Sequence, residues 1–570
     1  MLIMYISDIY NLKSSKKVSD VRGWVDTIRH HGGLLFFELR DHDSKVQVVT
    51  DKPDDFDNVK NEYYVSVTGD LIKRKKENIN SEEEYGDIEI KLETLNVISH
   101  SKVLPFQIED DIEVDEQIRL KHRYLDIRRS EMKNNILARS KTFKSIREAM
   151  NKLGIDEIDT PTLIKSTPEG AKDFIVPSRK SPGNFYALPQ SPQMYKQLFM
   201  LSGLKNYYQI AKCYRDEDSR KDRQPEFTQL DIEISNGDPE IVQDIIEKTM
   251  KHLLKSVYSI QIKTPFKRIS YEESLMLYGT DKPDLRINET IKDLTDIFID
   301  TEISFIKNTI NNKGSVRGFI LDKLLTRSEI DNLDKLVKDE GSAGLGWFKI
   351  TDNEISGPLT KILNEKEINE IKKYNNSTIL FQAGNSLETA SILDLLRRKI
   401  YVPNKTEQFE FVWIDEFPYF EYENEELQPS HHPFTSPKNT EEFNKNPENA
   451  TALHYDLVLN GIELGSGSQR INDPNIQTSV LSKWGLSDSE INERFGWFIE
   501  ALSYGSPQHA GFAIGIDRLI AEMVNADSIR DVIPFPKTQS GLDPLTNAPA
   551  KLSEKDLEEY NIQVNLVDDE

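Results

Sequence analysis

The chain has 570 residues, of which 29% are charged and 37% hydrophobic, and its formal net charge is −24. This length exceeds what one hydrophobic core supports, so we expect two to four domains. The acidic balance excludes broad, unspecific binding of nucleic acid and confines any such contact to a local patch.

The sequence contains no run of 18 apolar residues, and its first ten residues include no basic residue. We therefore expect neither a membrane partner nor a secretory signal. The single cysteine, Cys213, excludes an intramolecular disulfide framework and a zinc cage made of thiolates. It also favours a reducing, cytoplasmic location.

The first part of the chain, 1–103, is predicted to form a small β-barrel. Five short stretches have the composition of strands: 18–25, 34–40, 45–50, 63–71 and 87–98. Five strands so close together are typical of a closed barrel of the oligonucleotide-binding (OB-fold) kind.

The next segment, 104–130, is polar and punctuated, and it is predicted to be a hinge. A helix is expected at 135–153. Its apolar side chains recur every three to four residues, at Ile136, Phe143, Ile146, Met150 and Leu153. Gly154 is placed to end this helix.

Two blocks, 131–286 and 406–570, share a strand-rich composition punctuated by glycine. The block between them, 287–405, instead carries Lys/Glu-rich helical stretches and short apolar strands, without a catalytic constellation. The simplest interpretation is one catalytic domain interrupted by an inserted α+β domain. The fold class predicted for the whole chain is therefore α+β and multidomain.

The stretch 207–233 predicts two strands joined by a charged loop. In the second strand the apolar side chains share one face, and Gln229, Asp231 and Glu233 share the other. A face of acceptors is suited to a cationic group, and Arg215 at the end of the first strand can clamp a phosphate. A plain amphipathic hairpin with surface charges has the same pattern.

The dipeptide Asn460-Gly461 predicts a two-residue hairpin loop. Val458 then faces Glu463, and Asp456 lies two residues back on the same face. Both carboxylates therefore converge within reach of one hard cation.

Two further segments have little side-chain bulk. In 464–469, glycine and serine let a ligand lie close to the backbone before Arg470, although an isolated arginine is more often a surface residue. In 511–520, a glycine-punctuated strand leads into a helix headed by Arg518, which can stack on a flat ring or bind its phosphate. The established nucleotide fingerprints are absent, so glycine alone does not identify a nucleotide site.

Two polar clusters complete the pattern. The stretch 190–197 places amide and ammonium donors at a helix start, and His431 and His432 follow an acidic loop. No third soft ligand lies near the histidine pair in sequence, so a zinc site is not expected there.

In order along the chain, eight stretches resemble the motifs of class II aminoacyl-tRNA synthetases, in the form that bacterial aspartyl enzymes have. They are TPTLIKSTPEGAKDF (160–174), ALPQSPQMYKQL (187–198), CYRDEDSRKDRQPEFTQLDIE (213–233), GTDKPDLR (279–286), HHPFTSP (431–437), YDLVLNGIELGSGSQRI (455–471), AGFAIGIDRL (510–519) and IRDVIPFPKTQSG (529–541). The stretch RGWVDTIRHHGGLLFFELRD (22–41) is similar to the anticodon-binding barrel of that family. The resemblance is weakest at 287–405, where bacterial members carry a family-specific insertion domain.

The resemblance implies an antiparallel class II sheet flanked by helices, and a homodimer built around motif 1, which ends near Thr160-Pro161. It implies an aspartate–tRNA ligase that uses ATP and Mg2+ to form aspartyl-adenylate and then esterifies tRNA-Asp. Arg215 and Arg518 are the implied catalytic residues, and Asp456 and Glu463 the implied Mg2+ ligands.

The same resemblance implies two sets of substrate-binding residues. The ATP site comprises Arg215, Asp216, Glu217, Gln224, Glu463, Gly515, Ile516, Asp517 and Arg518. The aspartate site comprises Glu169, Gln193, Lys196, Arg215, Asp231, His431 and Arg470. In the second set, Lys196 and Arg470 supply positive charge for the β-carboxylate, and Asp231 and Glu169 suit the ammonium group.

In the barrel the resemblance assigns the anticodon-reading positions and the positions that decide the choice of tRNA. The first set comprises Arg29, Phe36, Gln47 and Glu89, and the second His31 and Glu77. Strict relatives tend to carry Leu at the first of these two positions and Lys at the second, whereas relaxed relatives carry His and Gly. Glu77 matches neither pattern, and His31 can equally be an exposed loop residue. Acceptance of tRNA-Asn therefore stays open, and with it a functional link to an amidotransferase that would convert the product.

Two other functions remain to be separated from this one. An asparaginyl enzyme is disfavoured, because an amide would leave buried cationic groups without a counter-charge. A non-catalytic RNA-binding paralogue should have lost Arg215, Asp456, Glu463 or Arg518, and all four are present.

Overall fold

The computed structural model describes residues 4–10, 12, 16–42, 44–56, 58–81, 85–166, 170–404, 409–423 and 426–565. By its internal contacts the chain divides into two units, Met1–Val114 and Asp115–Glu570. The division falls inside the stretch predicted to be a hinge. None of the helices in the described part of the chain combines the length and the apolar character needed to cross a bilayer.

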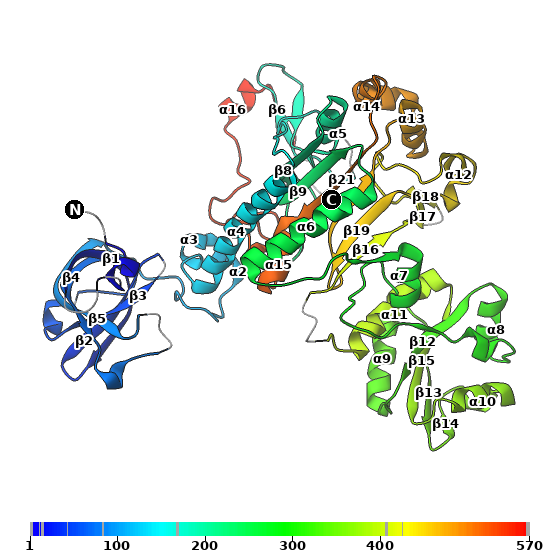
Figure 1. Ribbon diagram of the computed structural model, residues 1–570, viewed down its shortest axis with the longest axis horizontal. Coiled ribbons are helices and arrows are strands. Elements are labelled where there is room, and N and C mark those ends of the chain that lie inside the picture. The colour runs from blue at the N-terminus through cyan, green and yellow to red at the C-terminus, as the bar shows by residue number, and fades with distance from the viewer. Residues whose placement is uncertain are drawn as a thin grey trace. The chain divides into compact units, whose positions relative to one another are not determined.

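The first unit is a closed five-stranded barrel with strand order β1-β2-β3-β5-β4 (Figure 1). Its elements are α1 (Ile6–Tyr10), β1 (Lys17–His31), β2 (Leu34–Arg40), β3 (Lys45–Thr50), β4 (Tyr64–Lys73) and β5 (Ile88–Ser99). Alternate side chains of β2 face inward, so that Leu35, Phe37 and Leu39 are buried while Phe36 is half-buried on the outer surface. The predicted OB-fold barrel is confirmed.

The second unit contains a seven-stranded sheet of order β10-β16-β19-β20-β21-β9-β8. Its neighbouring strands are antiparallel except for β10 and β16. The strands are β8 (Asn206–Tyr214), β9 (Glu226–Ser235), β10 (Lys267–Ser270), β16 (Phe411–Asp415), β19 (His454–Leu459), β20 (Ile462–Gln469) and β21 (His509–Gly515). Three strands precede the insertion and four follow it, so both parts of the chain build one sheet.

One face of this sheet packs against α4 (Ser130–Leu153), α6 (Pro239–Tyr258) and α15 (Ile516–Val524). Figure 1 shows α4 and α6 side by side. The shared core takes Leu230, Ile232 and Ile234 from β9 and Ile246 and Met250 from α6. The helix predicted at 135–153 begins five residues earlier, at Ser130, and it ends before Gly154, whose φ of 69° is left-handed.

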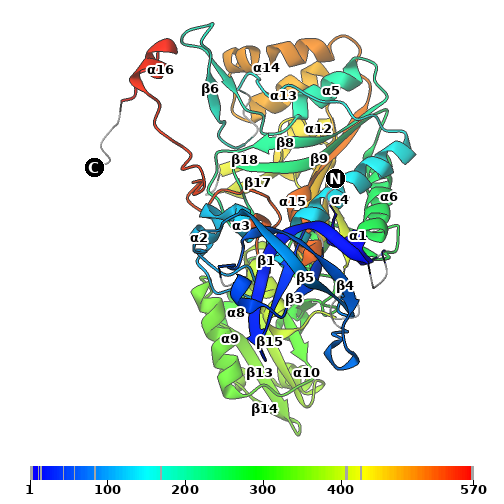
Figure 2. The same ribbon diagram turned by 90° about the vertical axis from the view of Figure 1, so that its left-hand side faces the viewer.

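Outside the sheet and the insertion, this unit contains further helices and short strands. They are α2 (Glu116–Lys121), α3 (Arg123–Asp126), β6 (Ile175–Pro177), β7 (Phe185–Ala187), α5 (Gln193–Leu201), α7 (Tyr271–Tyr278), β17 (Phe420–Glu423), β18 (Glu426–Pro429), α12 (Thr440–Lys445), α13 (Pro474–Lys483), α14 (Asp488–Leu502) and α16 (Glu554–Glu559). In Figure 2, α5, α13 and α14 lie together, because Met194, Leu481 and Phe495 share one apolar cluster.

The stretch predicted to be a hinge is helical in its second half, because α2 and α3 lie within it. Arg123 of α3 is buried and donates hydrogen bonds to the carbonyls of Arg530, Ile533 and Pro534. A single guanidinium satisfies three carbonyls, so these polar residues lie inside the unit and not in an exposed linker.

The insertion folds as a five-stranded sheet of order β11-β12-β15-β13-β14 with helices on both faces. Its elements are β11 (Lys292–Asp293), α8 (Ser304–Asn311), β12 (Ser315–Leu321), α9 (Arg327–Asp339), β13 (Gly346–Thr351), β14 (Glu354–Ser356), α10 (Glu365–Lys372), β15 (Ser377–Gly384) and α11 (Ser386–Ile400). One apolar cluster joins the sheet to α8 and α10, and another joins it to α9 and α11. The predicted α+β character of this block is confirmed.

Candidate active site

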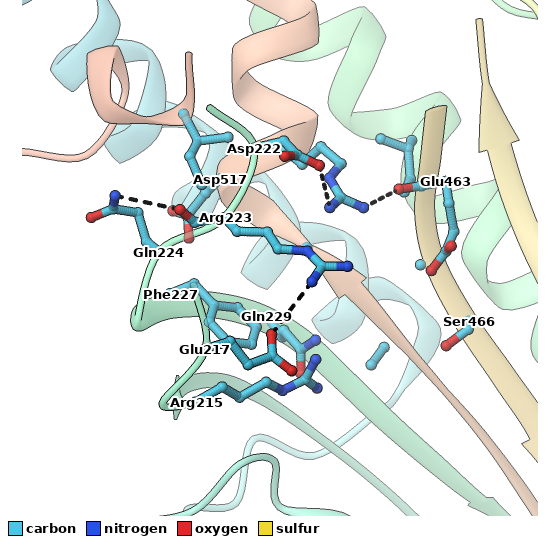
Figure 3. A pocket seen from close by; sticks show the side chains of 16 residues that line it. Arg215, Glu217, Asp222, Arg223, Gln224, Phe227, Gln229, Glu463, Ser466 and Asp517 are labelled. Atoms are coloured by element: carbon cyan, nitrogen blue, oxygen red, sulfur yellow. Dashed lines mark hydrogen bonds and ion pairs between the residues drawn. The ribbon is translucent and has the colours of Figure 1, made fainter. Parts of the chain in front are cut away.

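A cavity of about 260 Å3 lies between β9, β20, β21 and the start of α15 (Figure 3). Seven of the nine residues predicted for ATP line it: Arg215, Glu217, Gln224, Glu463, Gly515, Asp517 and Arg518. The other two lie elsewhere. Ile516 is fully buried in the core of the sheet, and Asp216 is exposed, with its backbone N–H donating to the carbonyl of Lys172.

Arg215 is held against an aromatic ring on the floor of this cavity. Its guanidinium carbon lies 5.1 Å from the centroid of the Phe227 ring, and Figure 3 shows the two side chains with Glu217 beside them. Its buried Nε has no hydrogen-bond partner among the described residues. A fixed guanidinium with an unused donor is suited to a phosphate.

Arg518 also lines this cavity. Its Nη1 donates to the backbone carbonyl of Glu463 at 2.7 Å, and its Nη2 lies 3.3 Å from Oδ2 of Asp222. Figure 3 shows Asp222 and Glu463 among the residues that line this cavity. The Arg518 side chain is half-buried and is held by these two groups. The flat face of its guanidinium can therefore stack on a planar ligand.

Two lining residues have structural partners. Asp517 is paired with Arg139 of α4, and its Oδ2 accepts the backbone N–H of Thr228 at 2.7 Å. These bonds connect the first turn of α15 to β9 and α4. The amide of Gln224 makes reciprocal bonds of 3.0 and 2.8 Å to the backbone of Lys537.

A buried cluster of charges occupies the same face of the sheet, under α5. Lys196 Nζ lies 2.7 Å from Asp231 Oδ1 and 3.3 Å from Glu233 Oε2. Arg470 donates to both carboxylate oxygens of Glu233, at 3.0 and 3.2 Å. All four side chains are at most 2% exposed, which rules out both the surface hairpin and the surface arginine.

The two carboxyl groups of this cluster differ in their electrostatics. Burial raises the pKa of Asp231 more than Lys196 lowers it. Burial would also raise the pKa of Glu233, but Arg470 and Lys196 outweigh it and lower that pKa. Glu233 is therefore the permanent counter-charge of Arg470.

Arg470 Nη1 points away from Glu233. It donates to Ser468 Oγ at 2.6 Å and lies 2.8 Å from Nε2 of His432. Burial, and then the charge of Arg470, lowers the pKa of His432 well below its usual value, so this ring is neutral. Nη1 of Arg470 thus has only neutral partners. A ligand carboxylate can displace these partners and accept a hydrogen bond from Nη1.

Glu233 approaches the neighbouring strand so closely that only glycine fits at position 511. A Cβ on Gly511, its partner in β21, would lie 1.8 Å from Glu233 Oε2. In the Gly/Ser strand, a Cβ on Gly465 would lie 2.1 Å from the backbone oxygen of Ala513. Both glycines therefore leave room for the protein's own atoms. Gly465 and Ser466 also line the cavity, so a ligand there can lie close to the backbone of this strand.

Three other residues predicted for aspartate have different environments. Gln193, the first residue of α5, is buried, and its Nε2 lacks a hydrogen-bond partner among the described residues. His431 is half-buried, with Nε2 3.1 Å from the carbonyl of Pro418. Glu169 lies outside the described residues, but Gln190 binds both the backbone of Ala171 and the Asp173 carboxylate just beyond it.

The hairpin predicted to carry the metal ligands has the expected turn. Asn460 and Gly461 have φ of 53° and 87°, and Val458 pairs with Glu463. A bulge then displaces the register, so that Asp456 lies opposite Ser466.

The two carboxylates of this hairpin nevertheless affect each other. Burial, and then Asp456, raises the pKa of Glu463, while burial and Asp281 raise the pKa of Asp456 to about 8. Lys282 Nζ lies between Asp281 and Glu463, at 3.2 and 3.3 Å.

The residues present fit a magnesium ion. Within the described residues, no three His, Cys, Asp or Glu side chains gather as they would around a closed metal site. Glu463 lines the cavity, and Asp456 is a buried carboxyl group whose charge acts on it. Mg2+ is commonly held by one or two carboxylates, with substrate phosphates completing its coordination.

On the barrel, the four predicted anticodon residues share the outer surface. Arg29 and Phe36 are direct partners in β1 and β2, and Gln47 Nε2 donates to Glu89 Oε2 at 2.6 Å. The two residues predicted for the choice of tRNA are exposed: His31 ends β1, and Glu77 lies in a short 3-10 turn.

Sequence reasoning did not assign roles to several residues that the structure brings into the site. In the sequence, Glu233 falls on the acceptor face, and His432 and Lys282 stand in the quoted motifs. The sequence therefore offered a signal for all three residues. His454 and Arg139 had no sequence signal, because each depends on a distant partner.

Comparison with known proteins identifies the family of this chain. Residues 115–539 match the family of class II tRNA synthetases (D, K and N), and residues 20–98 match the OB-fold nucleic acid binding domain. A protein of Caldanaerobacter subterraneus is 43% identical over 96% of this chain and 95% of its own, and one of Dictyoglomus turgidum is 44% identical over 97% of each. Both are named aspartate–tRNA(Asp/Asn) ligase.

Solved structures share the fold. The asparaginyl-tRNA synthetase of Pyrococcus horikoshii, complexed with asparaginyl-adenylate, is similar with a TM-score of 0.58 at 18% identity, covering 94% of this chain and 98% of that one. The aspartyl-tRNA synthetase of Entamoeba histolytica has a TM-score of 0.56 at 18% identity, covering 94% and 91%. The chain belongs to the class II aminoacyl-tRNA synthetases, in the group of aspartyl, lysyl and asparaginyl enzymes.

Proposed function

We propose that this enzyme uses ATP to attach L-aspartate to the 3′ end of tRNA-Asp, and also to that of tRNA-Asn. The observation that carries the choice of amino acid is Arg470, a buried guanidinium held by Glu233 with Nη1 facing only neutral partners. The names of the relatives support the choice of both tRNAs.

The charge cluster accounts for the recognition of aspartate. The β-carboxylate takes Nη1 of Arg470 and displaces the neutral contact with His432. The ammonium group is bound by Asp231 together with Glu169, and Gln193 contributes its unused amide donor. Asparagine would bring a neutral amide to the same guanidinium, which lowers its affinity because a charged hydrogen bond is lost.

In the first step, an oxygen of the aspartate α-carboxylate attacks the α-phosphorus of ATP. The bond from that phosphorus to the bridging oxygen breaks, and pyrophosphate leaves with the electron pair. Arg215 and Arg518, which both line the cavity, stabilise the charge that develops on the phosphate oxygens. Mg2+ held by Asp456 and Glu463 would neutralise phosphate charge as a Lewis acid.

In the second step, a terminal ribose hydroxyl of the tRNA attacks the carbonyl carbon of the adenylate. The ester bond forms, the mixed anhydride bond breaks, and AMP leaves with the hydroxyl proton. No side chain acts as a nucleophile in either step, so the protein contributes orientation and electrostatics.

The barrel reads the anticodon with Arg29, Phe36, Gln47 and Glu89. Phe36 supplies a ring on which a base stacks, and the bonded pair Gln47 and Glu89 presents polar edges beside it. His31 and Glu77 belong to the choice between tRNA-Asp and tRNA-Asn. An enzyme that charges both needs an amidotransferase partner to convert Asp-tRNA-Asn.

We further propose a homodimer and a cytoplasmic location, where ATP and tRNA are present. Near motif 1, Leu137 of α4 and Leu163 are exposed by 42% and 52%, which supports an interface there. Sedimentation of the purified protein tests the oligomeric state, with Leu163→Asp expected to shift it toward the monomer.

The decisive experiment is ATP–pyrophosphate exchange with single amino acids. L-aspartate should support exchange, and L-asparagine and L-lysine should not exceed about a hundredth of that rate. Exchange driven best by asparagine, or no exchange with any of the three, would overturn the proposed activity.

A further inference from the structure

We propose that His454 is a positioning residue that couples the magnesium carboxylate Asp456 to the aspartate pocket. This inference rests on the proposed function, because it assigns Asp456 to Mg2+ and His431 to aspartate. It concerns a residue that neither the motifs nor the substrate-binding sets include.

The first contact is a hydrogen bond within β19. His454 Nε2 lies 2.8 Å from Asp456 Oδ1, and both side chains are buried. Two residues apart on one strand, they project on the same face of the sheet. The bond engages one carboxylate oxygen and fixes the rotation of the group, so that a cation meets Asp456 through the other oxygen, Oδ2.

The second contact is a ring stack. The imidazoles of His454 and His431 lie 3.8 Å apart between centroids, with their planes at 19°. Phe417 meets both rings edge-on, at 5.0 and 5.4 Å. His431 is tied in turn to the carbonyl of Pro418, so neither ring can move without displacing the other.

His454 therefore has two separable attachments. Its ring stacks on a residue of the aspartate pocket, and its Nε2 holds a carboxylate of the metal site. Occupation of either site restricts His454 and lowers the cost of ordering the other. The coupling between aspartate and the divalent cation is reciprocal, since a binding free energy shared by two ligands acts on both.

Two substitutions separate the attachments. His454→Phe keeps an aromatic ring for the stack and removes the hydrogen bond. His454→Gln keeps an amide nitrogen near the position of Nε2 and removes the ring. A residue that only fills space would affect both variants through stability alone.

The measurements use the full-length enzyme, with thermal unfolding as the check on folding. Mn2+ is the probe for the metal site, titrated by electron paramagnetic resonance in the presence of a non-hydrolysable ATP analogue. Aspartate binding is titrated by calorimetry with and without Mg2+, and the Mg2+ dependence and the KM for aspartate are taken from pyrophosphate exchange.

For His454→Phe we expect the Mn2+ dissociation constant and the Mg2+ midpoint to rise about tenfold, with the KM for aspartate at saturating Mg2+ within about twofold of wild type. For His454→Gln we expect the reverse: a near-normal Mn2+ constant and a severalfold higher KM for aspartate. In wild type, Mg2+ should strengthen aspartate binding, and both variants should reduce that effect.

An unchanged Mn2+ constant and Mg2+ midpoint in a folded His454→Phe variant would overturn the inference. The inference would also be overturned if both variants lost Mn2+ affinity and aspartate affinity to the same extent. Should the phenylalanine variant fail to fold, a normal Mg2+ midpoint together with an unchanged KM for aspartate in His454→Gln would also overturn it. Absence of aspartate-dependent exchange in wild type would instead refute the proposed function, which separates the two failures.

Discussion

Arg470 and Glu233 face each other through two parallel hydrogen bonds of 3.0 and 3.2 Å, although 237 residues separate them in the chain. Each is the main charge partner of the other in a region from which water is excluded. The pair holds the guanidinium in the orientation that presents Nη1 to a ligand. Substitutions of Arg470 and of Glu233 should therefore have different effects on binding and stability.

Replacing Arg470 by Leu should abolish aspartate activation while ATP binding persists, because Arg215 and Phe227 lie in the separate nucleotide cavity. Aspartate-dependent pyrophosphate exchange and calorimetric titration of ATP measure the two effects. Near-normal exchange in this variant would show that Arg470 does not bind the β-carboxylate.

Replacing Glu233 by Gln should leave Arg470 and Lys196 with one carboxylate between them. Breaking a buried pair in this way costs about 3–5 kcal/mol, so we expect a lower melting temperature together with a large rise in the KM for aspartate. Glu226→Gln is the matched control, since it lies on the same strand with an exposed carboxylate paired to Lys212. Equal effects of the two substitutions would contradict the role given to Glu233.

The same pair predicts how stability depends on pH. The pKa of Glu233 in the folded protein is lowered from its usual value of 4.5. Its contribution to stability is therefore fully present above that value and is lost as pH falls through the lower, folded pKa. The difference in free energy of unfolding between wild type and Glu233→Gln should be constant from about pH 7 to pH 5 and shrink below pH 4.5. If the difference in free energy of unfolding instead grew as the pH fell, this prediction would be wrong.

Replacing Glu463 by Ala should remove one of the two carboxylates proposed to hold Mg2+ and free Lys282 from its contact at 3.3 Å. We expect adenylate formation to need a higher Mg2+ concentration, by roughly tenfold, while its dependence on aspartate changes little. An unaltered Mg2+ titration would show that Asp456 and Glu463 do not act on the same ion.

Replacing Phe36 by Ala should weaken tRNA binding without affecting amino acid activation. Loss of one stacked base costs roughly 1–3 kcal/mol, which corresponds to about a fivefold to hundredfold rise in the KM for tRNA. Pyrophosphate exchange without tRNA is the internal control, because the barrel takes no part in that step. Equal loss in both assays would indicate misfolding.

The choice of tRNA is tested by charging purified tRNA-Asn and tRNA-Asp with radiolabelled aspartate. We expect both to accept aspartate, and His31→Leu to reduce charging of tRNA-Asn more than that of tRNA-Asp. Charging of tRNA-Asn at less than about a thousandth of the tRNA-Asp efficiency, a gap of ~4 kcal/mol, would show a discriminating enzyme.

Local chemistry determined much of this protein from its sequence. The strands of the barrel, the helix that ends at Gly154 and the turn at Asn460-Gly461 depend on alternation, periodicity and positive φ, which act over a few residues. The pairing of Val458 with Glu463 followed from that turn. The start of α4 and the helices α2 and α3 were not predicted, because polar residues such as Arg123 are buried there by carbonyls more than 400 residues away.

Only the tertiary structure decided what the site residues do for one another. Both faces of β9 are buried, because helices pack its apolar side while α5 places Lys196 over its carboxylates. A bulge changed the register at Asp456, and the stack of His454 on His431 joins two segments that share no local pattern. Periodicity records which face of an element is apolar, but a buried ion pair is specified by the position of a partner in space, and that position depends on how the whole sheet assembles.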